Sequence, residues 1–186
     1  RDYDYNAIQY AGQHGIVRRN VFYDNQGGGL NFQVYTNEAL YNYGHRVYHN
    51  TFYNNRCYAI AASSDTTASR YYDNQVKNNL IYKNYDCLGN PTQILIGNPT
   101  AVILTNNLIT ATDPLFINEP GRDLRLRTGS QAIDTGASLT TTVGAGSGTV
   151  IPVVDAGYFY DGYGIPGEIG DLIQLTGQTQ TARITQ

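Results

Sequence analysis

The sequence predicts an all-β fold, a parallel β-helix of about four to five coils followed by a β-rich C-terminal extension. One short phrase recurs four times, and the asparagines that lead the copies follow one another at nearly constant intervals along the chain. A fixed period of this kind indicates a repeat architecture, in which each unit buries its apolar face against its neighbours. The leucine pattern of leucine-rich repeats and the long amphipathic stretches of helical repeats are both absent. The copies span residues 17–25, 47–55, 76–84 and 104–110.

Within each copy, a large apolar residue stands three positions before the asparagine and another stands two positions after it. The residues between them are mostly polar, and the run is too short for a helix, so each copy is predicted to form two short strands. We expect all the apolar members to lie stacked in the interior. They are Val17 and Phe22, Val47 and Phe52, Val76 and Ile81, and Leu104 and Ile109.

The leading asparagines are predicted to form the corner between the two strands, because Asn tolerates the left-handed conformation that a sharp corner needs. Coils stacked about 4.8 Å apart would let each side-chain amide bond to the next. The expected internal ladder consists of Asn20, Asn50, Asn79 and Asn107, in a structural role. A second column at Asn25, Asn55 and Asn84 ends in the last copy, where Thr112 stands.

The other segments are assigned from their patterns. Third strands of the coils are predicted at 30–32, 58–60 and 94–96, and an incomplete first coil carries a strand within 5–10. Residues 37–45 and 63–74 are expected as loops. The predicted organisation is a β-helix at 1–136, a Gly/Ser/Thr-rich linker at 137–149, and antiparallel β-structure at 150–186 that turns at Gly177.

The phrase Asn-x-Phe/Ile-Tyr-x-Asn at this spacing resembles the right-handed parallel β-helix repeats of the pectate-lyase-like superfamily, in its bacterial secreted form. Residues 113–117, 123–126 and 129–136 look like the closing coils of such proteins, so the resemblance covers about residues 6–136. It implies a right-handed helix. The C-terminal extension resembles the start of a small β-barrel whose strands continue in related proteins. The superfamily includes lyases, hydrolases, epimerases, adhesins and phage spikes, so the activity stays open.

The composition limits the partners. The net charge is −3, the pI is about 5.5, and no basic stripe appears, which argues against nucleic acid. No run of 18 apolar residues exists, so no membrane insertion is expected. The chain begins with Arg1 and shows no signal peptide, which suggests a processed product or an excerpt of a longer protein.

Cys57 and Cys87 lie one repeat apart, and they occupy nearly equivalent places after Asn50 and Asn79. Neighbouring coils are close enough for a disulfide, although a pair of buried free thiols remains the alternative. A bridge would fit an oxidising, extracellular setting. No metal site is predicted, because zinc needs more ligands than these cysteines supply and the three histidines lack ligand spacing.

A basic and aromatic strip is the catalytic candidate. Arg18, Tyr48 and Lys77 share one outward column, and the resemblance implies that a lyase of this fold uses a Lys or Arg base beside a uronate carboxylate. Outward positions of any solenoid are usually polar, so solvation alone is the alternative. Such a lyase would use Ca²⁺, which needs carboxylates, but the available ones do not share a column. These are Asp24, Asp65, Asp73 and Asp86.

Tyr23, Tyr53 and Tyr82 form another outward column, and His49 lies beside it in the pattern. These side chains are candidates for carbohydrate binding, because aromatic rings stack on sugars. The alternative is that the tyrosines only stabilise the sheet through cross-strand contacts.

The resulting functional prediction is a secreted or cell-surface structural module that assembles end to end with itself and contacts glycans. The unpaired edges expected at 5–10 and 172–184 are the predicted contacts between copies. The alternative is a polysaccharide lyase that acts on acidic, uronate-containing polysaccharide. The sequence leaves open whether the protein is an enzyme.

Overall fold

The computed structural model describes residues 6–33, 41–62, 70–145 and 147–185, and every regular element among them is a β-strand. The chain divides into two compact units, Arg1–Ala137 and Ser138–Gln186. The first unit is a parallel β-helix of about four coils, as predicted, and it carries an antiparallel hairpin at its end. The second unit contains a further antiparallel hairpin.

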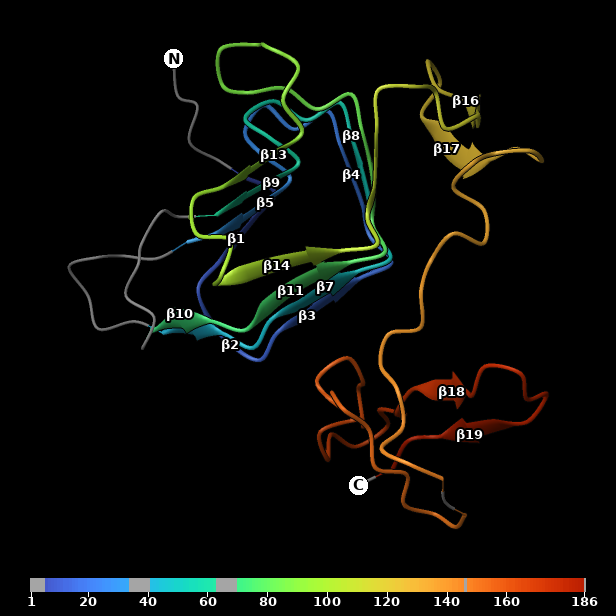
Figure 1. Ribbon diagram of the computed structural model, residues 1–186. Coiled ribbons are helices and arrows are strands. Elements are labelled where there is room, and N and C mark those ends of the chain that lie inside the picture. The colour runs from blue at the N-terminus through green and yellow to red at the C-terminus, as the bar shows by residue number, and fades with distance from the viewer. Residues whose placement is uncertain (1–5, 34–40, 63–69, 146, 186) are drawn as a thin grey trace. The chain divides into compact units, whose positions relative to one another are not determined.

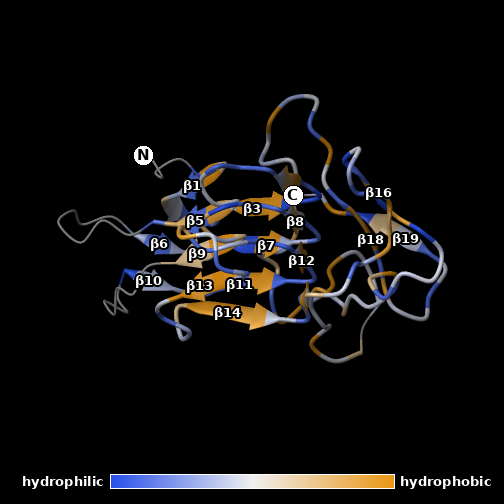
Figure 2. Cartoon of the chain, turned by 90° about the horizontal axis from the view of Figure 1, so that it is seen from above, coloured by the Kyte–Doolittle hydropathy of each residue, from blue (hydrophilic) through white to orange (hydrophobic). Residues whose placement is uncertain are grey.

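Four parallel sheets form the sides of the β-helix, and strands of successive coils stack on one another in each sheet (Figures 1 and 2). Sheet A contains β1 (Ile8–Tyr10), β5 (Leu30–Phe32), β9 (Ile60–Ala62) and β13 (Ile94–Ile96). Sheet B contains β2 (Gly12–Gln13), β6 (Asn42–Tyr43) and β10 (Tyr71–Tyr72). Sheet C contains β3 (Ile16–Arg18), β7 (Arg46–Tyr48), β11 (Asn74–Lys77) and β14 (Val102–Thr105). Sheet D contains β4 (Val21–Tyr23), β8 (Thr51–Tyr53), β12 (Leu80–Tyr82) and β15 (Leu108–Thr110).

The first three coils therefore have four strands each, and the prediction of three was wrong. The missed sheet B is made of two-residue strands, too short for alternation of polar and apolar residues to reveal them. Two of its strands fall in the segments predicted as loops, 37–45 and 63–74; residues 34–40 and 63–69 lie outside the described part of the chain. The strand predicted at 58–60 lies instead at Ile60–Ala62.

The predicted register of the core columns is confirmed. Val17, Val47, Val76 and Leu104 pair in order across sheet C, and Phe22, Phe52, Ile81 and Ile109 pair across sheet D. The members from the first three coils are buried, and the rings of Phe22 and Phe52 stack with centroids 4.6 Å apart. The prediction that all members are buried is wrong for the fourth coil, where Leu104 is 38% and Ile109 is 46% exposed. Their strands pair on one side only among the described residues, so no further described coil covers them.

The corners of the coils use a left-handed residue, but it is not the ladder asparagine as expected. The preceding residue has the positive φ in each coil: Arg19 (57°), His49 (54°), Asn78 (55°) and Asn106 (50°). This bend turns the next side chain, the asparagine, into the coil. Asn50 and Asn79 are buried there, where their amides reach the neighbouring coils.

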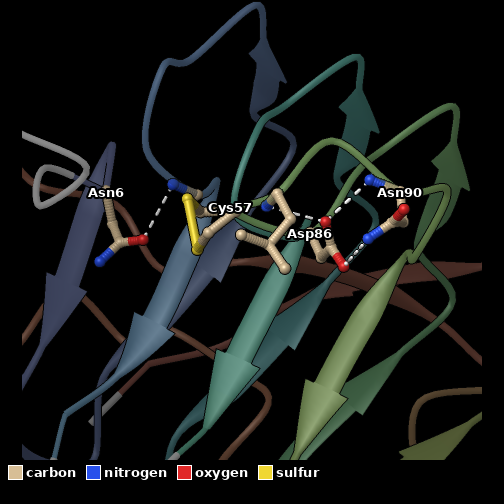
Figure 3. The surroundings of a disulfide bond; sticks show 7 residues. Asn6, Cys57, Asp86 and Asn90 are labelled. Carbon is tan, nitrogen blue, oxygen red and sulfur yellow. Dashed lines mark hydrogen bonds between the residues drawn. A yellow bond between two sulfur atoms is a disulfide. The ribbon is translucent and has the colours of Figure 1, made fainter. Parts of the chain in front are cut away.

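A disulfide joins Cys57 and Cys87, as the one-repeat spacing predicted (Figure 3). Beside it, the carboxylate of Asp86 accepts hydrogen bonds from the backbone and side chain of Asn90. These bonds lower the pKa of Asp86, the side-chain bond being the largest cause. The bridge therefore links the turn that follows β8 to the turn that follows β12 in the next coil, beside a tightly hydrogen-bonded loop.

The second unit contains the antiparallel pair predicted around Gly177. Its strands β18 (Leu172–Gln174) and β19 (Thr181–Arg183) form a hairpin, and Gly177 has the positive φ (82°) that its turn requires. Thr142 also forms an antiparallel bridge with Val153 within this unit.

Candidate functional site

The end of the β-helix formed by the fourth coil presents an apolar face that no described strand covers, which we call the coil-end face. Its strands β13, β14 and β15 each pair with a strand of the third coil and with no other described strand. Leu104 and Ile109 contribute the inward-facing side chains that would be buried if another coil followed. Ile94 and Ile96 from β13 are also only partly buried. The coil-end face therefore combines apolar side chains with open strand edges.

The asparagine ladder runs through the β-helix with a fixed direction. The backbone N–H of Asn20 donates to Oδ1 of Asn50 (3.0 Å), that of Asn50 to Oδ1 of Asn79 (2.9 Å), and that of Asn79 to Oδ1 of Asn107 (3.0 Å). The side-chain amides repeat this direction. Each asparagine-to-asparagine bond donates from an earlier coil to a later one, while the side-chain nitrogens also donate back to a carbonyl of the earlier coil, that of Val17, Val47 or Val76.

The two ends of the ladder are consequently different. Oδ1 of Asn20 accepts no hydrogen bond from any described residue, and the backbone N–H of Asn107 finds no acceptor in the part of the chain that the structure describes. Among the described residues, the first coil thus ends in a free side-chain acceptor and the fourth coil in a free backbone N–H, while Nδ2 of Asn107 donates back to the carbonyl of Val76 (2.8 Å). The two ends are complementary to each other and not to themselves.

The second column of asparagines ends at a glutamine that accepts its last hydrogen bonds. Asn25 donates to Asn55 and Asn55 to Asn84, as the sequence suggested. Oε1 of Gln93 then accepts from both the backbone N–H and the side chain of Asn84 at 3.0 Å. The repeat pattern could not predict this closure, because Gln93 lies outside the repeated phrase.

The structure brings the predicted catalytic strip together. Arg18 pairs with Tyr48, and Tyr48 with Lys77, on neighbouring strands of sheet C. Nη1 of Arg18 donates to the hydroxyl of Tyr48 (3.1 Å). Tyr48 is buried, so the strip is not an open row of side chains. The described residues include no cluster of three or more His, Cys, Asp or Glu that could hold a metal ion, and Asp65 lies outside them.

The predicted tyrosine column for sugar binding needs correction. Tyr23 is exposed, but Tyr53 and Tyr82 are buried against Phe116, so two of its three rings cannot receive a sugar. The covering segment is the antiparallel hairpin of β16 (Phe116–Asn118) and β17 (Asp123–Leu126), which packs Leu124 and Leu126 on the same cluster.

Polar contacts attach this hairpin to sheet D. The hydroxyl of Tyr53 donates to Glu119 (2.8 Å), and burial together with this contact raises the pKa of Tyr53 to about 12. Glu119 also forms an ion pair with Lys83, and Arg122 forms one with Asp24. Apolar and polar contacts together therefore hold the hairpin on the outer face of sheet D.

His49, the other predicted sugar-binding residue, lies on the corner between sheets C and D. It is exposed, and its Nε2 lies 3.3 Å from the Asn78 amide of the next coil. Partial burial, with Arg19 and Arg18 as weaker causes, lowers the pKa of His49. Because the hairpin covers two of the three tyrosines, His49 does not form one open site with that column.

An exposed aromatic strip, which the repeat pattern did not predict, lies on the outer face of sheet B. The rings of Tyr43 and Tyr72 stack with centroids 4.6 Å apart and an interplanar angle of 7°, and Tyr41 contacts the edge of Tyr43. Tyr41 is 45% and Tyr72 is 40% exposed. The spacing of these tyrosines could have revealed the strip, because Tyr43 and Tyr72 are separated by one repeat, just as Asn50 and Asn79 are.

Comparison of the chain with protein-family models, with curated proteins and with solved structures found no match. Within the described residues, no helix is long and apolar enough to cross a membrane. The architecture, a parallel β-helix stapled by one disulfide, is thus established by the structure itself.

Proposed function

We propose that this protein is an extracellular structural module whose β-helix assembles end to end, the fourth coil of one copy stacking on the first coil of the next. The observation that carries the proposal is the coil-end face, where Leu104 and Ile109 are exposed although they belong to core columns that are otherwise buried. Exposed strand edges pair readily with other chains, and apolar side chains gain free energy when another coil covers them.

The direction of the asparagine ladder favours a second copy in head-to-tail orientation as the occupant. In this orientation the backbone N–H of Asn107 meets Oδ1 of Asn20 in the next copy, which repeats the bond that each earlier asparagine of the ladder makes. Two coil-end faces placed against each other would instead oppose donors to donors. A head-to-tail contact uses different surfaces on the two partners, so it repeats and extends into a filament.

An extracellular location agrees with the disulfide, because such bridges persist in oxidising compartments. The likeness of the repeats to secreted β-helix proteins of the pectate-lyase-like superfamily supports the same location. Neither observation requires an enzymatic activity, and no feature of the Arg18–Tyr48–Lys77 strip favours the lyase over the structural module.

Sedimentation velocity of the pure chain over a range of concentrations tests the proposal. We expect assemblies that grow with concentration, and we expect the double substitution Leu104→Lys with Ile109→Lys to abolish them by placing charges on the coil-end face. Leu88→Lys is the matched control, because Leu88 is a strongly exposed apolar residue in the loop beside the disulfide. A folded monomer at every concentration, or equal effects of both changes, would refute end-to-end stacking.

A further inference from the structure

The outer face of sheet B carries a second site that is independent of the coil-end face. We propose that the aromatic strip formed by Tyr41, Tyr43 and Tyr72 binds a polysaccharide, with one pyranose ring stacked on Tyr72. The site differs from the tyrosine column that the sequence suggested, and it requires no catalysis.

The geometry of the strip begins with a column of outward side chains. Gln13, Tyr43 and Tyr72 pair in order across β2, β6 and β10. The hydroxyl of Tyr43 donates to Oε1 of Gln13 (2.7 Å), and the Tyr43 ring lies flat against that of Tyr72. One face of Tyr72 is therefore occupied by Tyr43, and the column is held in a fixed orientation.

The opposite face of Tyr72 is where the column stops. Sheet B has three strands among the described residues, while the other three sheets have four, so no described strand of the fourth coil continues the column beyond β10. Tyr72 remains 40% exposed in this position. In the fourth coil, residues 97–101 connect β13 directly to β14 and form no strand of sheet B, so the layer beyond Tyr72, about one coil further on, holds no described strand.

The chemistry of this position suits a pyranose. The face of an aromatic ring carries partial negative charge, which attracts the weakly positive C–H groups on the flat side of a sugar. Tyr41 meets Tyr43 edge to face with centroids 6.2 Å apart, and it extends the aromatic surface sideways. Such a platform can contact more than one ring of a polysaccharide chain.

Polar groups at the margin of the strip can bind the hydroxyls of the sugar. Asp73 follows Tyr72 directly, and its side chain is 45% exposed. Its two carboxylate oxygens accept from Nη2 of Arg46 (2.9 Å) and from Nε2 of Gln75 (3.4 Å), which fixes the carboxylate in the residue that follows Tyr72. A fixed acceptor next to an aromatic face provides both the orientation and the hydrogen bonding that sugar binding needs.

A structural role alone does not account for all of these features. Stacking of Tyr43 on Tyr72 stabilises the short sheet, as cross-strand aromatic pairs do. Tyr41, however, lies outside the strands of sheet B and remains 45% exposed. Its apolar ring is left in contact with solvent beside an already formed pair. A ligand that covers the three rings together explains why Tyr41 lies there.

The test is isothermal titration of the Leu104→Lys, Ile109→Lys background with soluble hexasaccharides, because this background separates sugar binding from assembly. Cellohexaose and xylohexaose represent neutral chains, and a hexamer of galacturonate represents acidic chains. We expect at least one to bind, and the comparison identifies whether the sugar is neutral or acidic. Failure of all three at millimolar concentration would overturn the proposal without affecting end-to-end stacking.

Variants locate the site. Tyr72→Ala should weaken binding about tenfold, since an aromatic contact contributes up to about one power of ten. Tyr72→Phe, which keeps the ring, should bind like the parent. Tyr41→Ala provides a second disruption that leaves the Tyr43–Tyr72 stack intact, and Tyr163→Ala in the second unit is the matched exposed control. Unchanged binding in folded Tyr72→Ala and Tyr41→Ala, or loss in Tyr23→Ala instead, would place the sugar elsewhere.

Discussion

Asn50 illustrates how a single side chain connects three coils. Its amide nitrogen donates to the carbonyl of Val17 in the first coil (2.9 Å) and to Oδ1 of Asn79 in the third (3.0 Å), while its own Oδ1 accepts from Asn20. If the Asn50 side chain were removed, these groups would lose their hydrogen-bond partner and water could not replace it, because Asn50 is buried. The ladder thus satisfies the backbone polar groups at a corner that no regular sheet can reach.

Asn50→Ala is therefore predicted to destabilise the fold by more than the same change at the end of the ladder. Each buried group left without a partner costs roughly 1–3 kcal/mol, whereas Asn20 is exposed and water can replace its bonds. Urea unfolding of Asn50→Ala and Asn20→Ala measures the difference in the free energy of unfolding. Equal losses in the two variants would show that the ladder position is unimportant.

His45 occupies the place of an asparagine in a third column. Its Nδ1 accepts from the backbone N–H of Gly15 (3.0 Å), and its own backbone N–H donates to Oδ1 of Asn74 (3.2 Å). Its ring stacks on Tyr10 with centroids 4.2 Å apart. Burial is the main cause that lowers the pKa of His45 to about 4, partly offset by a hydrogen bond with the backbone of Gly12.

The stability of the protein is consequently predicted to fall as the pH is lowered from about 6.5 to about 4. In this window the unfolded chain binds a proton at His45 and the folded chain does not, which costs up to about 3 kcal/mol of unfolding free energy. His45→Asn should retain the acceptor for Gly15 and flatten the pH dependence, with a smaller slope of the same sign remaining from His49. Unfolding curves at several pH values measure this, and identical slopes in both proteins would contradict it.

At the scale of elements, the disulfide is the covalent link between coils. It joins Cys57 and Cys87, which are one repeat apart, and so closes a loop of a single coil. A cross-link of this length restricts the unfolded chain and is expected to stabilise the folded state by roughly 3–4 kcal/mol. Reduction should therefore lower the unfolding free energy by about this amount without changing the circular dichroism spectrum of the native fold.

The double substitution Cys57→Ser with Cys87→Ser is the control for this prediction. Its stability should match that of the reduced protein and should not respond to added reductant. Reduction that leaves the unfolding free energy unchanged would mean that stacking of the coils alone fixes this turn.

The elements also show why sequence reasoning succeeded in some places and failed in others. The columns through Val47 and Phe52 were predictable because a constant offset from the asparagine fixes their register. The cover of Tyr53 by Phe116 was not, because the contact joins segments that are far apart in the sequence and follows no period. Local pattern reveals stacking between repeats, but it does not reveal which surface a non-repeated hairpin will cover.

The same limit applied to the candidate sites. Tyr23, Tyr53 and Tyr82 stood out because they belong to the repeated phrase. Tyr43 and Tyr72 lie in segments of variable length between repeats, so their common column became visible only when sheet B placed them on neighbouring coils. Exposure, which decides whether a ring can bind a ligand, depends on tertiary packing that the sequence pattern does not contain.

At the scale of the whole molecule, the β-helix is a stack whose interior coils each have two neighbours and whose end coils have one. The energetic consequence is concentrated at Leu104 and Ile109, which have core identities and surface exposure at the same time. The asparagine ladder adds a direction to this stack, because each backbone N–H in it donates to the asparagine of the following coil. A stack with one apolar end and complementary polar termini is suited to extension by copies of itself.

Hydrogen exchange at increasing protein concentration tests end-to-end stacking most directly, because it reports on the edge strands themselves. The account predicts that backbone amides in β14 and β15 become protected as the concentration rises, while the exposed hairpin of β18 and β19 in the second unit keeps its exchange rate. The Leu104→Lys, Ile109→Lys variant should show no such change. Exchange from β14 and β15 that is equally fast at every concentration would contradict the account.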